Sequence, residues 1–132
     1  MTHPAQARST YTVSFGQTAQ RRATQADTGR VPRVARTLAL AHHIDRMIRA
    51  GELRDLADAA RAIGVTRARM TQIANLSLLA PEIQEAIFGL PPVTNVRDPV
   101  SERALRRIVA EPDWKRQKRL WSAKMQVVSQ SK

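Results

Sequence analysis

Residues 56–75 read LADAARAIGVTRARMTQIAN, a pattern that predicts two short helices joined by a three-residue turn. Two helices that cross at a steep angle need a small residue where their backbones meet, and Ala60 stands in that place. Gly64 supplies the tolerance of positive φ that the turn requires. The apolar positions expected to be buried behind the turn are Val65, Met70 and Ile73. These requirements are met at the spacing of a helix-turn-helix.

The exposed face of the second helix, at about residues 66–76, favours contact with DNA. A surface helix in a bundle usually carries Glu and Lys in i, i+4 pairs, whereas this helix carries no acid. Arg can pair with guanine, Gln or Asn with adenine, and Thr can contact a phosphate or the thymine methyl group. The alternative is a plain helical hairpin in a small bundle, which also uses glycine turns and apolar periodicity. The expected base-reading residues are Thr66, Arg67, Arg69, Thr71, Gln72 and Asn75.

Further helices are expected on both sides of this motif. Upstream, apolar residues recur at helical spacing from Pro32 until Gly51, where the helix is expected to stop. Downstream, Pro81 opens a helix whose apolar side is expected to be Ile83, Ile87 and Phe88. The proline-rich segment that follows predicts a linker. The expected N-caps are Asp55, Thr66 and Ser101, and the last helix, from Pro112, carries Trp114, Trp121, Met125 and Val128 on one stripe.

Composition limits the class of protein. The chain has 132 residues, enough for one compact domain with flexible ends, and 42% of them are hydrophobic, a share that is typical of a globular protein and not of a fully disordered chain. Twenty of these residues are alanine and only 4% of the chain is aromatic, which favours a small helical core. The sequence therefore predicts an all-α fold, a small helical bundle that contains the helix-turn-helix.

Three further features point to a cytoplasmic protein. The chain has no cysteine, which fits a reducing compartment and excludes disulfide scaffolds and zinc knuckles. It has no apolar run long enough for a membrane helix and no apolar stretch of a secretory signal at its start. The expected location is the cytoplasm, in association with the nucleoid, and no membrane partner is expected.

The charge is strongly positive and unevenly distributed. The net charge is +11, with 22 Lys and Arg against 11 Asp and Glu, and such a field usually indicates a polyanionic partner. Residues 1–37 carry +5, residues 38–91 carry zero and residues 92–132 carry +6. The alternative is that the basic ends only aid solubility.

These charges divide the chain into three expected parts. They are a flexible basic N-terminal arm over 1–30, a helix-turn-helix domain over 31–91, and a linker with basic C-terminal helices over 92–132. The basic ends are expected to grip the phosphate backbone. The expected phosphate-contacting residues are Arg21, Arg22, Arg30, Arg33, Lys115, Arg116, Lys118 and Arg119.

Catalysis and cofactors find little support in the sequence. No nucleophile has a recognisable base nearby, and no pair of carboxylates stands in an apolar setting. His42 and His43 are adjacent and point to different helix faces, so they cannot form an i, i+4 metal pair. We therefore expect neither an enzyme, nor a metal site, nor a cofactor.

The run from Gly64 to Ile73, followed by Leu78-Leu79-Ala80-Pro81-Glu82-Ile83-Gln84-Glu85, resembles the helix-turn-helix region of the ParB/KorB partition proteins. It is also similar to small helix-turn-helix proteins found in bacteria beside site-specific recombinases. The resemblance covers roughly residues 33–90. It implies that residues 66–72 face an operator and that the helix from Pro81 braces the motif. The arginine box and the long dimerisation domain of the ParB family have no counterpart in this sequence, so CTP binding and clamp behaviour are not carried over.

The sequence thus predicts a protein that binds double-stranded DNA specifically, as a transcriptional regulator or a partition-like accessory factor. A homodimer is expected because such motifs normally bind as dimers, and the helix with Trp114 and Trp121 could pair two copies. The main alternative is an adaptor that docks on a site-specific recombinase or another DNA enzyme and binds DNA only non-specifically. A general RNA-binding protein is a weaker alternative, because aromatic stacking platforms are scarce.

Overall fold

The computed structural model describes residues 29–94 and 97–130. Over these residues the chain is helical and contains no β-strand, which confirms the predicted all-α fold; the one β-bridge joins Arg30 to Val93. The predicted arm over 1–30 therefore lies almost wholly outside the described residues. The helices are α2 (Arg33–Arg49), α3 (Leu56–Ile63), α4 (Arg67–Asn75), the 3₁₀ turn η1 (Leu76–Leu78), α5 (Pro81–Phe88), α6 (Glu102–Val109) and α7 (Trp114–Gln130).

The turn between α3 and α4 follows from three local residues. The Asp55 side chain caps α3 by accepting a hydrogen bond of 2.9 Å from the Asp58 N–H. Gly64 ends α3 at a φ of 87°, a left-handed conformation that favours glycine. The Thr66 hydroxyl oxygen then caps α4 by accepting from the Arg69 N–H at 3.0 Å. The two helices are thus separated by residues 64–66, as the sequence predicts.

Two hydrophobic clusters hold the helices together, and α2 contributes to both. The smaller cluster joins the second half of α2 to α3 and α4, and its members are Ala41, Ile44, Ala59, Ala60, Met70 and Ile73. The larger cluster joins the first half of α2 to η1 and the C-terminal helices. Its members are Val34, Ala35, Leu38, Leu76, Leu79, Ala80, Ile83, Ile87, Val100, Leu105, Ile108 and Trp121. Residues from both sides of the predicted boundary at 91 therefore share one core.

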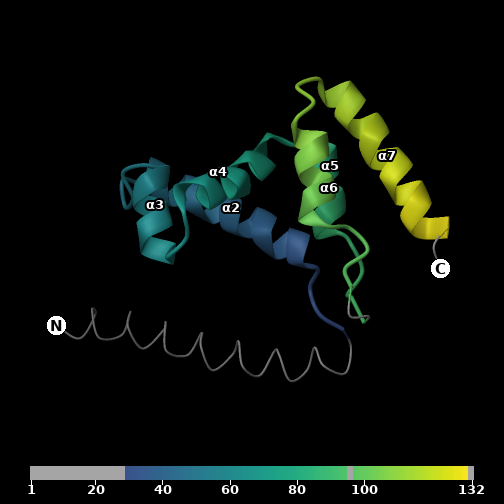
Figure 1. Cartoon of the computed structure of the whole chain (residues 1–132), viewed down its shortest axis with the longest axis horizontal. Helices are drawn as coiled ribbons and strands as arrows, with labels where there is room; N and C mark the ends of the chain where they lie inside the picture. The colour runs from purple at the N-terminus through teal and green to yellow at the C-terminus, as the bar shows by residue number, and fades with distance from the viewer. Residues whose placement is uncertain (1–28, 95–96, 131–132) are drawn as a thin grey trace.

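The last helix lies at the end of the molecule remote from α3 (Figure 1). Trp121 fixes α7 to the larger cluster and is only 9% exposed. Gln117 is buried beside it, where its Oε1 accepts from the Ala80 N–H and its Nε2 donates to the Glu111 carbonyl oxygen, both at 2.8 Å. Because both polar ends of this buried amide are satisfied, Gln117 links the start of α5 to the start of α7.

Two aromatic side chains are more exposed than their place in the apolar stripes suggests. Phe88, expected on the apolar side of α5, is 51% exposed and lies against the ring of His42. Trp114 is also 51% exposed, and its indole N–H donates to the Leu78 carbonyl oxygen at 3.2 Å. Both residues stand at a helix end, where the partner helix covers only one side of a large ring.

Candidate nucleic-acid interface

The two faces of α4 differ completely in burial. Met70 and Ile73 point into the smaller cluster and are at most 3% exposed. The exposed positions of the helix and its N-cap are Thr66, Arg67, Ala68, Thr71, Gln72 and Asn75. Five of the six expected base-reading residues therefore share one exposed surface, which we call the α4 face.

Most of the hydrogen-bonding capacity of the α4 face remains available. Neither Arg67 nor Asn75 forms a side-chain hydrogen bond or ion pair with another residue in the described part of the chain. The Thr71 hydroxyl donates to the Arg67 carbonyl oxygen at 3.0 Å, and the Gln72 Oε1 accepts from Arg69 at 3.3 Å, so the Gln72 amide N–H groups point elsewhere. A surface with free guanidinium and amide donors and no carboxylate is suited to base edges or phosphates.

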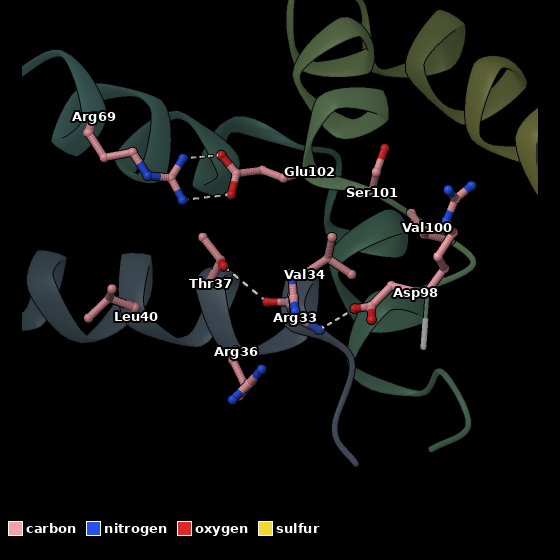
Figure 2. A pocket seen from close by; sticks show the side chains of 11 residues that line it. Arg33, Val34, Arg36, Thr37, Leu40, Arg69, Asp98, Val100, Ser101 and Glu102 are labelled. Carbon is pink, nitrogen blue, oxygen red and sulfur yellow. Dashed lines mark hydrogen bonds and ion pairs between the residues drawn. The ribbon is translucent and has the colours of Figure 1, made fainter. Parts of the chain in front are cut away.

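The sixth expected base-reading residue, Arg69, is already paired within the protein, with Gln72 of the α4 face and with Glu102. Its guanidinium forms a two-point ion pair with Glu102 of α6, with Nη2 2.9 Å from Oε1 and Nη1 bonded to Oε2 (Figure 2). Arg106 adds a contact of 2.9 Å to Oε2 of the same carboxylate. The hydrogen bond from Arg69 lowers the pKa of Glu102, and the same bond raises the pKa of Arg69. The Arg69–Glu102 pair therefore fixes α4 against α6.

The expected phosphate-contacting residues differ in how far they are already paired. Arg30 forms an ion pair with Asp98, to which the Arg33 backbone N–H also donates at 2.6 Å. Arg116 lies 3.8 Å from Asp113 and 3.9 Å from Glu111. Lys118 bonds Glu82 at 2.8 Å, which lowers the pKa of that carboxyl. Lys115 and Arg119 have no side-chain partner in the described part of the chain, and Arg21 and Arg22 lie outside it.

The surface of α7 remains positively charged although Arg116 and Lys118 form ion pairs. The helix contains five basic residues and no acid, and its exposed surface includes the free Lys115 and Arg119. The α4 face and α7 belong to different ends of the molecule (Figure 1).

Sequence reasoning missed Glu102 and Asp98, the two carboxylates that organise this surface. Glu102 stands 33 residues after Arg69, and Asp98 stands 68 residues after Arg30, so no local pattern links either pair. The Ser101 N-cap, which was predicted, is the one nearby signal: its hydroxyl accepts from the Ala104 N–H at 3.1 Å and fixes where α6 begins.

Residues 29–94 and 97–130 contain neither a metal-ligand cluster nor a membrane-spanning helix. No group of three or more His, Cys, Asp or Glu residues there is arranged to hold a metal ion. None of the described helices has the length and apolarity needed to cross a membrane.

Comparison with protein-family models, with curated proteins and with solved structures finds no match in any of the three.

Proposed function

We propose that this chain is a helix-turn-helix protein that binds double-stranded DNA and places α4 in the major groove. The observation that carries the proposal is the α4 face, a continuous exposed surface of Arg, Gln, Asn and Thr side chains without a carboxylate. In the expected mode, Arg67 pairs with a guanine, Gln72 or Asn75 pairs with an adenine, and Thr66 and Thr71 contact phosphate or a thymine methyl group.

The backbone around this face supports the proposal. A recognition helix must be held rigidly by its neighbour, and α3 meets α4 through Ala60, which is 2% exposed, and Met70, which is fully buried. Gly64 provides the sharp exit from α3 at a positive φ, which glycine adopts without strain. The same spacing underlies the resemblance to ParB/KorB proteins, in which this region binds an operator.

Arg69 has a different part in this proposal from the one expected from the sequence. Both terminal nitrogens of the Arg69 guanidinium, Nη1 and Nη2, already donate to Glu102. We therefore assign Arg69 to positioning α4 and leave base recognition to the other five residues. Non-specific affinity comes from the basic surface of α7, chiefly the unpaired Lys115 and Arg119. A transcriptional regulator or partition-like accessory factor at the nucleoid, acting as a homodimer on an inverted repeat, fits this division of labour.

Selection from random duplex DNA at moderate salt tests the proposal. We expect a preferred site to be enriched, and we expect Arg67→Ala or Gln72→Ala to weaken binding to that site by about 1–3 kcal/mol with less loss on random DNA. Arg107→Ala, which removes an exposed arginine of α6 outside the α4 face, is the matched control. Equal losses on preferred and random DNA would contradict base recognition by α4.

A second candidate is an adaptor that docks on a recombinase or another DNA enzyme. The observation that favours it is a pair of exposed apolar side chains on α7, Leu120 at 46% and Val127 at 57% exposure. Trp121 of the same helix is buried in the protein's own core and does not add to this exposed pair. Absence of any enriched DNA site, together with affinity for random duplex, would favour the adaptor.

A further inference from the structure

A pocket of about 730 Å³ opens between α2, α4 and the start of α6, next to the Arg69–Glu102 pair. Figure 2 shows the side chains of α2 on one side, Arg69 and Glu102 on the opposite side, and Asp98 and Ser101 at the end. This volume lies within the range of pockets that hold small molecules. The lining residues are Arg33, Val34, Arg36, Thr37, Leu40, Arg69, Arg97, Asp98, Val100, Ser101 and Glu102.

The charges of the pocket favour an anion. Its lining contains four arginines and two carboxylates, and both carboxylates already have arginine partners: Asp98 binds Arg30, and Glu102 binds Arg69 and Arg106. The guanidinium groups of Arg36 and Arg97 form no hydrogen bond or ion pair with the described residues, and Arg33 contacts Asp98 by a hydrogen bond from its backbone. Arg36 and Arg97 therefore keep guanidinium groups for a carboxylate or phosphate, the groups that arginine binds in a two-point fashion. Arg33, whose charge also acts on Asp98, adds a third positive charge to the lining.

The floor of the pocket favours an apolar group attached to that anion. Leu40 is half-buried and still presents apolar surface to water, whereas Val34 and Val100, which also line the pocket, are each only 1% exposed. An inorganic ion would leave the Leu40 surface in water, whereas an aromatic or aliphatic group would cover it. We propose that the pocket binds a small organic anion, a phosphate or carboxylate carried on an apolar group, through Arg33, Arg36 and Arg97.

A backbone phosphate of DNA is a poorer occupant. The duplex is a convex rod whose phosphates meet donors on the protein surface, and it has no apolar group to reach a floor behind those donors. A small molecule can fill both parts of the pocket together. The bound molecule would lie against Arg69, which lines the pocket and also forms the ion pair that positions α4.

Phenyl phosphate is a suitable probe, because it combines both features. We expect it to shift the amide NMR signals of residues 33–40 and 97–102 in the full-length protein, and to bind about tenfold more tightly than inorganic phosphate. Arg36→Gln should weaken phenyl phosphate binding about tenfold, since one charge-assisted hydrogen-bonding group is lost. Arg107→Gln, an equally conservative change outside the pocket, should leave it within about twofold.

Three results would overturn the proposal. They are equal affinity for phenyl phosphate and inorganic phosphate, equal effects of the Arg36→Gln and Arg107→Gln changes, and signal shifts centred on Lys115 and Arg119 of α7 in place of the pocket. The Arg36→Gln variant should unfold at the same temperature as the unaltered protein. A loss of binding by this variant then comes from the pocket and not from unfolding. Arg36 is exposed and unpaired, so the fold should not depend on it.

A final measurement separates this site from DNA binding. The probe is titrated into the free protein, so failure of the proposed DNA-binding function leaves the expected result unchanged. Arg67→Ala, which should remove sequence preference, should bind phenyl phosphate as the unaltered protein does. The small-molecule proposal fails if a short random duplex displaces phenyl phosphate and if Arg36→Gln, but not Arg107→Gln, lowers the affinity for that duplex. In that case the pocket contacts the phosphate backbone of DNA.

Discussion

The two ends of the molecule are built on different principles. The end formed by α3 and α4 has a small core in which two of the six members are alanines of α3, and its geometry comes from nearby residues: a cap, a glycine and a second cap. The end formed by α5, α6 and α7 has twice as many core members, and they come from positions between Val34 and Trp121. The first end presents the α4 face, and the second carries the basic helix α7.

The α4 face lies at the end with the smaller core. A core of six residues, half of them alanines, buries little apolar area, so α3 and α4 depend on α2, which continues into the larger cluster. The Arg69–Glu102 ion pair joins α4 directly to α6. We therefore expect changes in the large cluster to unfold the whole protein and changes near α4 to act more locally.

The largest effect is expected from Trp121→Ala. The side chain is 9% exposed within the larger cluster, so its removal should lower the free energy of unfolding by about 3–5 kcal/mol. Trp114→Ala is the matched control on the same helix: that ring is 51% exposed, and its loss should cost markedly less. Urea unfolding followed by circular dichroism measures both. Similar losses for the two variants would contradict the packing of α7 through Trp121.

A smaller effect is expected from Gly64→Ala. No atom lies within 4 Å of the added Cβ, so the cost comes from the backbone at φ 87° and should be about 1–2 kcal/mol. Gly51→Ala, at φ 80° with equally open space, should cost a similar amount. Gly89→Ala is the control, because its φ is negative and the added Cβ would lie 3.5 Å from the Glu85 carbonyl oxygen, an ordinary contact.

These two glycine variants also sharpen the contrast between the ends. Both should lower stability to a similar degree, but only Gly64 sets the path from α3 into α4. If the DNA-binding proposal is right, Gly64→Ala should reduce specific affinity under conditions where both variants remain folded, and Gly51→Ala should not. Equal affinity of both variants for the preferred site would mean that the turn at Gly64 does not determine how α4 binds DNA.

The contrast also explains which features the sequence could predict. The N-caps Asp55, Thr66 and Ser101 and the turn at Gly64 were found because each depends on residues within a few positions of one another. The burial of Met70 and Ile73 followed from helical periodicity for the same reason.

The contacts that the sequence could not predict are long-range. Nothing near Arg69 indicates that its guanidinium is bonded to Glu102, 33 residues later. Nothing near Gln117 indicates that this polar residue is buried against Ala80. Pairing of this kind depends on how α6 and α7 fold back on the rest of the chain, and charge patterns along the sequence contain no information about that path. The sequence therefore predicts the candidate site as a list of residues, without the pairing of Arg69 with Glu102.

The smallest effect on stability is expected from Glu102→Gln, which weakens the link between the two ends. The hydrogen bond from Arg69 lowers the pKa of Glu102 in the folded protein, so the unfolded chain binds more protons at acidic pH. The stabilisation is fully present above the unfolded value of about 4.3 and is lost as the pH falls through the lower folded pKa. Because the Arg69 side chain keeps 38% of its exposure, water screens the pair, and we expect its loss to cost about 1 kcal/mol at neutral pH.

The pH dependence distinguishes this link from an ordinary surface ion pair. Unfolding free energy measured between neutral pH and pH 3 should fall less steeply for Glu102→Gln than for the unaltered protein, since one carboxylate no longer contributes to the slope. Glu82→Gln removes the more exposed pair with Lys118, where water screens the charges further, and should change the slope less. Glu102→Gln should also loosen α4, seen as faster amide exchange at residues 70–75 with α7 unaffected. If the unfolding free energies of Glu102→Gln and Glu82→Gln changed equally with pH, the Arg69–Glu102 pair would contribute no more than an ordinary surface ion pair. The position of α4 would then depend on its small core and on α2.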